Sequence, residues 1–76
     1  TKELQAEKRR KERRIEFLEN RIAELETGIE ELRETMYDES IMTDHVKLAE
    51  ISEKIAELQN DLDSCYEEWT SFSEEI

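Results

Sequence analysis

The sequence predicts an all-α protein, an antiparallel hairpin of two helices packed against each other as a coiled coil. The 76 residues include one Gly and no Pro, which leaves too little turn chemistry for a many-stranded β fold. Charged residues make up 43% of the chain and hydrophobic residues 36%, so only a narrow apolar stripe is available for burial. That stripe keeps a heptad period, which a disordered polar chain has no reason to keep. We therefore expect one domain over residues 1–76.

The first helix is predicted to run from the N-terminal region to about Met36. Its apolar residues follow one another at alternating spacings of three and four. They are Ile15, Leu18, Ile22, Leu25, Ile29, Leu32 and Met36. This spacing is the a/d pattern of a coiled-coil seam. We take residues 1–14 as a lead-in to this helix and residues 15–36 as the segment that carries its seam.

The connection between the helices is predicted over residues 37–43, where the heptad phase breaks. Thr43 or Asp44 is expected to cap the second helix, over residues 44–76, by accepting hydrogen bonds from its first backbone amides. The second seam consists of Leu48, Ile51, Ile55, Leu58, Leu62, Cys65, Trp69, Phe72 and Ile76. Four apolar residues are expected to form a small cap beneath the turn: Tyr37, Ile41, Met42 and Val46.

Charges beside the seams favour the antiparallel arrangement but do not choose its register. One register places Arg14 near Glu68 and Arg21 near Asp61. Sliding the helices by one heptad places Arg14 near Glu75 and Arg21 near Glu68. Each exposed pair contributes only ~0.5 kcal/mol, so these charges specify orientation more than they stabilise.

Apolar matching favours the second of these registers. It sets Ile15 against Phe72 and Leu18 against Trp69, whereas the first leaves Trp69 opposite Lys11. We interpret Trp69 as a core residue whose aromatic edge lies at the open end of the hairpin.

No catalytic or metal-binding pattern appears in the sequence. The single cysteine, Cys65, excludes an internal disulfide framework and a cysteine zinc site, and its seam position predicts packing. There is no phosphate-binding Gly-rich loop and no nucleophile elbow, and a two-helix rod has no cleft in which to bury paired carboxylates. No apolar run is long enough for a membrane span. We expect His45 to face solvent, and we interpret Phe17, off the seam, as a candidate partner contact.

The net charge of −11 conceals two regions of opposite sign. Residues 1–14 hold seven Lys and Arg against three Glu, a net charge of +4, which leaves −15 for residues 15–76. A basic block of this kind suits phosphate binding. The alternative interpretation is a solvated helix face that pairs with the acidic end of the second helix, at Glu67, Glu68, Glu74 and Glu75. Because the acidic remainder repels phosphate, any nucleic-acid contact is expected to be end-on.

Residues 36–48 resemble the hairpin turn of the C-terminal coiled-coil domain of ABC-F ATPases, in particular the Uup-like branch. The elements in step are an acidic residue, an apolar pair, an Asp and a Lys-Leu that opens the second helix, here Asp38, Ile41–Met42, Asp44 and Lys47–Leu48. The closing Trp69, with an apolar residue three positions later, and the basic opening over residues 8–14 also resemble that domain.

The resemblance implies an accessory arm of a cytoplasmic bacterial protein, one with two ATPase cassettes that acts on ribosomes or binds nucleic acid. It implies no catalysis and no cofactor in this domain, since ATP and Mg would belong to upstream cassettes. The chain begins at Thr1 without Met and in mid-pattern, so we expect it to be a segment of a larger protein. The candidate phosphate contacts, without base specificity, are Lys8, Arg9, Arg10, Lys11, Arg13 and Arg14.

Two other functions stay open at this stage. One is a tRNA-binding helical arm like that ending valyl-tRNA synthetases, although the turn lacks the Ala-Pro of those arms and Trp69 is unlike them. The other is a purely structural dimerisation coiled coil, because Ile at a with Leu at d suits a parallel dimer. We expect no membrane partner and favour a monomeric hairpin over a homodimer.

Overall fold

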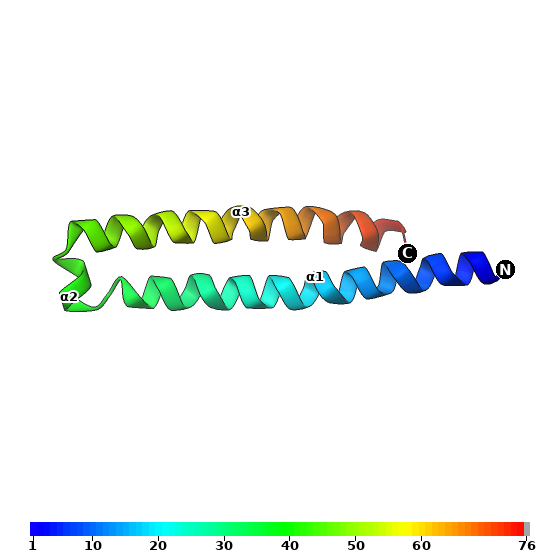
Figure 1. The fold of residues 1–76 in the computed structure, drawn as a ribbon, viewed down its shortest axis with the longest axis horizontal. Coiled ribbons are helices and arrows are strands. Elements are labelled where there is room, and N and C mark those ends of the chain that lie inside the picture. The colour runs from blue at the N-terminus through cyan, green and yellow to red at the C-terminus, as the bar shows by residue number, and fades with distance from the viewer. Residues whose placement is uncertain (76) are drawn as a thin grey trace.

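The computed structural model describes residues 1–75, and the burial of side chains over residues 1–74. The described residues form three helices, α1 (Lys2–Thr35), α2 (Glu39–Met42) and α3 (His45–Glu75). The long helices α1 and α3 lie side by side and point in opposite directions, so the N-terminal end of α1 and the C-terminal end of α3 lie at the same end of the molecule (Figure 1). The all-helical fold class is confirmed. The molecule is a rod of 62 × 14 × 14 Å.

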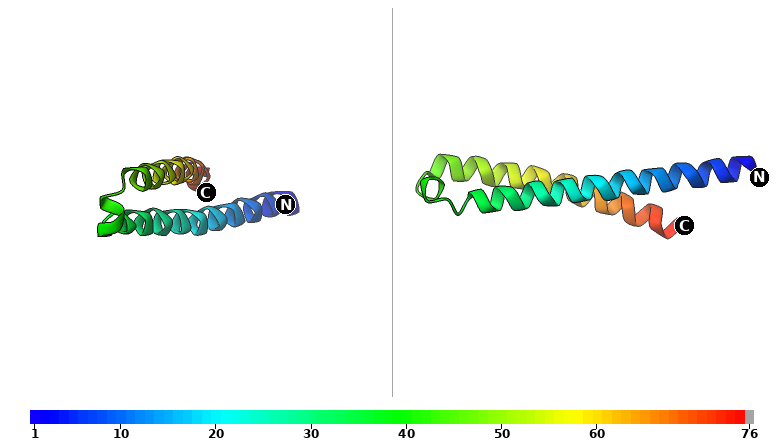
Figure 2. Two further views of the ribbon diagram at one scale, coloured as in Figure 1. Left: turned by 60° about the vertical axis from the view of Figure 1, so that its left-hand side comes forward. Right: turned by 90° about the horizontal axis from the view of Figure 1, so that it is seen from below.

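Helix α1 is continuous through the predicted lead-in and the predicted seam. Its 34 residues contain no proline, and the side chain of Thr1 accepts a hydrogen bond from the Leu4 backbone amide, 3.3 Å away, which caps the first turn. At ~1.5 Å per residue this helix is about 50 Å long. It crosses α3 at a shallow angle when the rod is viewed from below (Figure 2).

The core is a single apolar seam between α1 and α3. Leu18 and Leu25 are 1% and 2% exposed, and Ile22, Ile29 and Leu62 are also buried. Four half-buried residues of α3 pack against this cluster: Ile55, Leu58, Cys65 and Trp69. Cys65 and Trp69 are therefore packing residues, as their seam positions predict. The last predicted seam residue, Ile76, lies outside the described residues.

The turn contains a short helix, α2, where the sequence predicted only a connection. The Asp38 side chain accepts hydrogen bonds from the amide and the hydroxyl of Ser40 at its start, and the Thr43 hydroxyl donates to the Glu39 carbonyl at its end. Asp44 is the residue that caps α3, since its Oδ1 accepts from the amides of residues 46 and 47 at 3.1 and 3.2 Å. Thr43 thus closes α2 and does not cap α3.

The prediction of an apolar cap beneath the turn is wrong for three of its four residues. Tyr37, Val46 and Met42 are 78%, 68% and 53% exposed, while Ile41 is half-buried. The physical reason is geometric. Four residues of α2 make about one turn of helix, which is too little backbone to cover apolar side chains on both long helices.

The observed contacts between α1 and α3 agree in part with each of the two registers that the sequence allowed. Arg14 pairs with Glu68 at 2.8 Å, as in the register that apolar matching disfavoured, and Arg21 pairs with Glu24 of its own helix at 3.5 Å. The preferred pairing of Arg21 with Glu68 is therefore wrong, and the side chain of residue 75 is not described. Trp69, however, donates its indole N–H to Glu19, next to Leu18 in the chain. An arginine side chain is long enough to reach a carboxylate one helical turn away along the rod. Charged residues can therefore pair without lying at the same level as the apolar residues that pack together.

Candidate nucleic-acid interface

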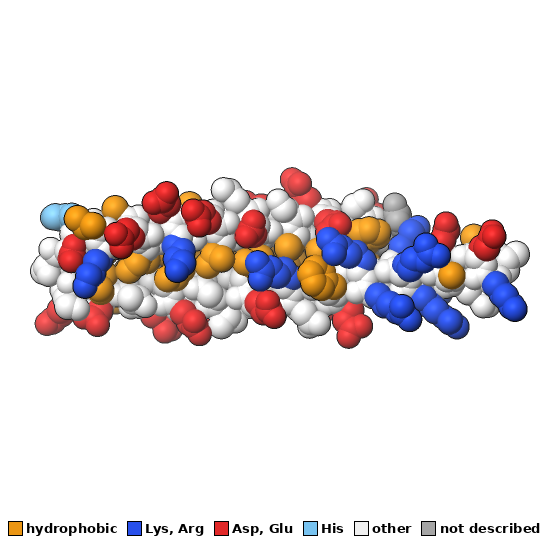
Figure 3. Space-filling view, viewed as in Figure 1, with side chains coloured by type: hydrophobic (Ala, Val, Ile, Leu, Met, Phe, Trp, Pro, Cys, Tyr) orange, Lys and Arg blue, Asp and Glu red, His pale blue; other side chains and the backbone are white. Residues whose placement is uncertain are grey.

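The basic lead-in forms the open end of the rod. The first turns of α1 project beyond the C-terminal end of α3 (Figure 1), and Lys and Arg side chains gather over this projecting end (Figure 3). Within residues 1–14 every residue is exposed except Ala6 and Lys11, which are half-buried. The structure thus presents the positive charge away from most of the acidic rod.

The six candidate residues do not share one face of α1. Successive residues of a helix are 100° apart, and only residues three or four apart are neighbours on its surface. Arg9 therefore lies above Arg13, Arg10 lies above Arg14, and Lys8 and Lys11 continue the seam positions. The cations surround the helix as a collar. A collar of this kind suits contact with phosphates on more than one side, and it offers no single face for reading base edges.

Four of these cations are available for a ligand. Among the described residues, no hydrogen bond or ion pair joins Lys8, Arg9, Arg10 or Arg13 to another side chain. Their flexible, solvated side chains can turn toward phosphate oxygens at little cost, since no existing partner has to be displaced.

Arg14 is held by the hairpin itself. Its guanidinium donates two hydrogen bonds to Glu68, at 2.8 and 3.3 Å, in a bidentate ion pair between α1 and α3. The same guanidinium lies 4.9 Å from the centre of the exposed Phe17 ring, a cation–π contact. Arg14 therefore contributes to pairing the two helices, and of the six candidates it fits the solvated-face interpretation best.

Two further hydrogen bonds between α1 and α3 were not anticipated from the sequence. Trp69 donates to Glu19 at 3.2 Å, and the Tyr66 hydroxyl donates to Glu26. The bond to the Glu26 carboxylate raises the pKa of Tyr66 because it favours the protonated phenol. Glu19 and Glu26 each follow a seam residue of α1 directly and are seven positions apart, so they occupy the same heptad position. That shared position beside the seam is the sequence feature from which these two hydrogen bonds could have been predicted.

The remaining candidate features show no assembled chemical site. His45, the first residue of α3, is exposed. Across the part of the chain that the structure describes, no group of three His, Cys, Asp or Glu side chains is placed to hold a metal ion. None of the described helices combines the length and the apolar composition needed to cross a membrane.

Comparison with known families identifies the domain. A profile of the ABC transporter C-terminal domain matches residues 3–74, nearly the whole chain. The chain belongs to this family. No curated protein and no solved structure gave a match. Membership of this family confirms the kinship with ABC proteins that the turn and the closing Trp69 indicate.

Family membership also bears on the other two functions that the sequence left open. As a C-terminal domain of an ABC protein, the chain is an accessory region and not the catalytic one. The interpretation as a synthetase arm is left without support, because the match covers both helices and the turn between them. A structural role for the coiled coil is compatible with the family and is separated from ligand binding only by experiment.

Proposed function

We propose that this domain is the antiparallel coiled-coil arm of a bacterial, cytoplasmic ABC-F ATPase, and that it binds nucleic acid through its basic end. The supporting observation is the separation of charge along the rod. Residues 1–14 carry a net charge of +4 and the other residues sum to −15, and the first turns of this basic segment project beyond α3. ATP and Mg would bind to cassettes elsewhere in the protein, and this domain would contribute docking only.

The charge distribution favours end-on contact. Phosphates that approach the side of the rod meet a surface with 19 Asp and Glu against four Lys and Arg over residues 15–76, and like charges repel over the ~8 Å Debye length at physiological salt. Phosphates that approach the open end meet Lys8, Arg9, Arg10 and Arg13, which have no partner among the described side chains. The ligand class is therefore the DNA or RNA backbone, ribosomal RNA included, bound without base specificity.

Tethering explains how a weak contact would be useful. Four available cations give modest affinity by themselves, since the non-specific binding of such sites falls steeply with salt. An arm attached to a larger protein that is already bound near its target acts at a high local concentration, so a weak contact of its own suffices.

A titration at low salt tests this proposal. Fluorescence anisotropy with a labelled 20-nucleotide duplex and a matching single strand, in about 50 mM salt, is expected to show binding that weakens linearly with the logarithm of salt concentration. Replacing Arg9, Arg10 and Arg13 by Gln is expected to reduce affinity at least tenfold on both oligonucleotides. It should also lower the duplex salt slope by up to ~0.9 for each phosphate that the variant no longer neutralises.

A matched control separates local contacts from net charge. Replacing Arg21, Arg33 and Lys54 by Gln removes the same three positive charges from outside the lead-in. This variant is expected to bind nearly as well as the unaltered chain. Equal reductions in affinity for the two variants would show that only total charge matters, and absence of binding at low salt would refute the proposal.

We also propose that the arm is a monomer. The seam residues Leu18 and Leu25 are already buried within a single chain, so dimerisation through the same seam would require the hairpin to open. Sedimentation equilibrium is expected to give the 9.1 kDa mass of one chain. A stable dimer would instead favour the structural dimerisation coiled coil.

A further inference from the structure

The hairpin tip exposes an apolar surface far from the basic end. Of the six large hydrophobic side chains that are exposed among the described residues, three belong to the tip: Tyr37, Met42 and Val46. The tip is the end opposite the two chain termini (Figure 1). We call Met36, Tyr37, Met42, Val46 and Leu48 the tip patch. Single exposed apolar residues are ordinary on a protein surface, but several gathered at one end of a small rod mark a candidate interaction site.

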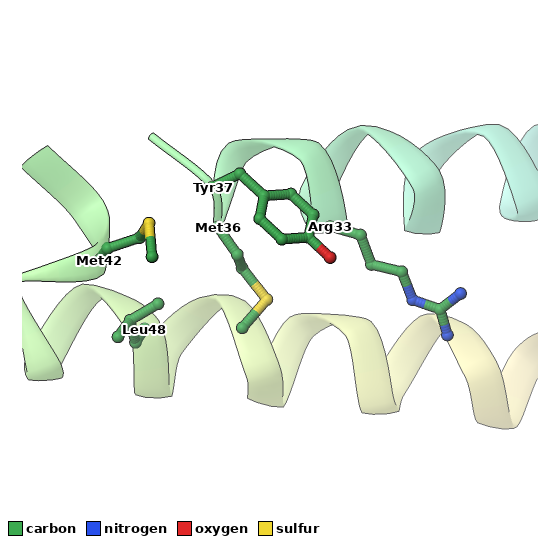
Figure 4. A pocket seen from close by; sticks show the side chains of 5 residues that line it. All are labelled: Arg33, Met36, Tyr37, Met42 and Leu48. Carbon is green, nitrogen blue, oxygen red and sulfur yellow. The ribbon is translucent and has the colours of Figure 1, made fainter. Parts of the chain in front are cut away.

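The tip patch contains a hollow of about 280 Å³. It is lined by Arg33 from the last turn of α1, Met36 and Tyr37 just past its end, Met42 from α2 and Leu48 from α3 (Figure 4). The short helix α2 lies across the end of the rod, between the ends of the two long helices (Figures 1 and 2). The volume of the hollow accommodates one or two large apolar side chains, and its two methionines are flexible enough to adapt to them.

The net negative charge around the tip patch disfavours nucleic acid and favours a basic occupant. Over residues 33–47 four carboxylates, Glu34, Asp38, Glu39 and Asp44, stand against two cations, Arg33, which lines the hollow, and Lys47, so the net charge of the tip is −2. The hydroxyl and the amide of Ser40 donate to Asp38 and hold the pKa of its carboxyl below the ordinary value, so this group is ionised at neutral pH. Phosphate would be repelled here, and a second copy of this acidic chain would bring like charges together.

We infer that the tip patch docks a basic amphipathic segment of a partner protein, with one apolar side chain of the partner in the hollow and its Lys or Arg side chains on the surrounding carboxylates. The apolar side chain of the partner supplies affinity, because its insertion buries the apolar lining of the hollow and the exposed surfaces of Tyr37 and Met42. The carboxylates supply orientation and speed of association. This contact is independent of nucleic-acid binding, since it lies at the other end of a 62 Å rod.

Two synthetic peptides of equal positive charge test the inference. One is an 18-residue amphipathic Leu–Lys peptide, and the other replaces each Leu by Ser. With the 76-residue chain, the Leu–Lys peptide is expected to bind at least tenfold more tightly, and to shift the amide NMR signals of residues 36–48 more than those of residues 1–14. Equal affinity for the two peptides would overturn the inference, because it would show a purely electrostatic attraction to the acidic rod.

Variants then localise the contact. Replacing Tyr37 and Met42 by Ser is expected to abolish the preference for the Leu–Lys peptide, whereas the matched replacement of the exposed Leu4 and Phe17 by Ser should keep it. Circular dichroism of both variants checks that the helices are intact, which their exposure leads us to expect. If the tip variant keeps the preference, the tip is not the docking surface.

Two further outcomes would assign the tip to another occupant. If the unaltered chain dimerises and the Tyr37/Met42 variant does not, the tip patch is an interface between copies of the chain. If the tip variant loses affinity for an oligonucleotide, the tip belongs to the nucleic-acid interface. Either result would overturn the inference.

Replacing Glu34 and Glu39 by Gln is expected to weaken Leu–Lys binding about threefold and leave oligonucleotide binding unchanged or slightly tighter.

Discussion

The middle of the rod and its tip both contain apolar side chains, yet they differ strongly in burial. Leu25, near the middle of α1, is 2% exposed, while Tyr37, just past the end of the same helix, is 78% exposed. In the middle, residues spaced three and four apart face an equally spaced row on α3. At the tip the apolar residues are no longer matched by an opposing helix, because the chain is reversing direction.

This difference shows that apolar composition alone does not make a core in a two-helix protein. A residue is buried only where both helices present an apolar side chain at the same level. The apolar tip is consequently available for a ligand, and the middle is not. Substitutions, salt and pH test this contrast between a buried seam and an exposed tip, in decreasing order of expected effect.

The largest effect is expected from truncating the seam. Leu25→Ala removes a nearly fully buried side chain and should lower the free energy of unfolding by about 2–4 kcal/mol. A core of this size supplies only ~3–5 kcal/mol in total, so much of the protein should be unfolded at room temperature. Urea denaturation followed by circular dichroism measures this. The exposed Leu4→Ala serves as the control, with an expected change of ~0.5 kcal/mol or less.

Gly28→Ala is expected to strengthen the same seam. Gly28 lies inside α1, where Ala is favoured over Gly by roughly 1 kcal/mol, and a Cβ built there lies 3.4 Å from Leu58 Cδ1, an acceptable contact. The free energy of unfolding should rise by about 0.5–1 kcal/mol in the same urea experiment. The reverse change at an exposed site of the same helix, Ala23→Gly, should lower it by a similar amount. Destabilisation by Gly28→Ala would show that the seam cannot accept one methyl group.

The ion pair at the open end is expected to contribute less than either change in the seam. A double-mutant cycle that replaces Arg14 and Glu68 by Ala should give a coupling energy of about 0.2–1 kcal/mol, because both side chains are more than a third exposed. The coupling should shrink further in about 1 M salt, where screening is stronger. A coupling well above this range would mean that the bidentate pair fixes the register.

The smallest effect is expected at the tip, on lowering the pH. Hydrogen bonds from Ser40 hold the pKa of Asp38 below its ordinary value of 3.8. A carboxyl group with a lowered pKa in the folded state stabilises that state above the ordinary pKa, and the stabilisation is lost as the pH falls through the lowered value. An NMR titration should show the Ser40 amide signal moving with a midpoint below pH 3.8. Ser40→Ala should raise the midpoint, and an unchanged midpoint would contradict this account.

Much of the fold followed from the heptads, and the features that did not follow have identifiable causes. Leu18 and Leu62 are seam residues by spacing and are buried. The helix α2 was missed because four residues carry no periodicity, although Asp38 followed by Ser40 is a capping signal. The charge pairing was missed because the heptad pattern repeats every seven residues, so a slide by one heptad keeps every apolar residue on the seam and still offers each arginine a carboxylate.

The candidate nucleic-acid interface was predictable only as a set of residues. Counting charges along the chain finds the basic lead-in, but it does not separate Arg14, which pairs with Glu68, from Arg9, Arg10 and Arg13, which pair with no described side chain. That separation depends on how far α3 extends along α1.

The sequence by itself determined that this protein is all-α, that each long helix has one apolar face, and that the positive charge lies near the N-terminus, because periodicity and charge are local properties of the chain. The tertiary structure decided which charges pair, which end of α1 projects beyond α3 and which apolar residues at the tip stay exposed. These features depend on the axial position of one helix against the other, and neither helix encodes that position alone.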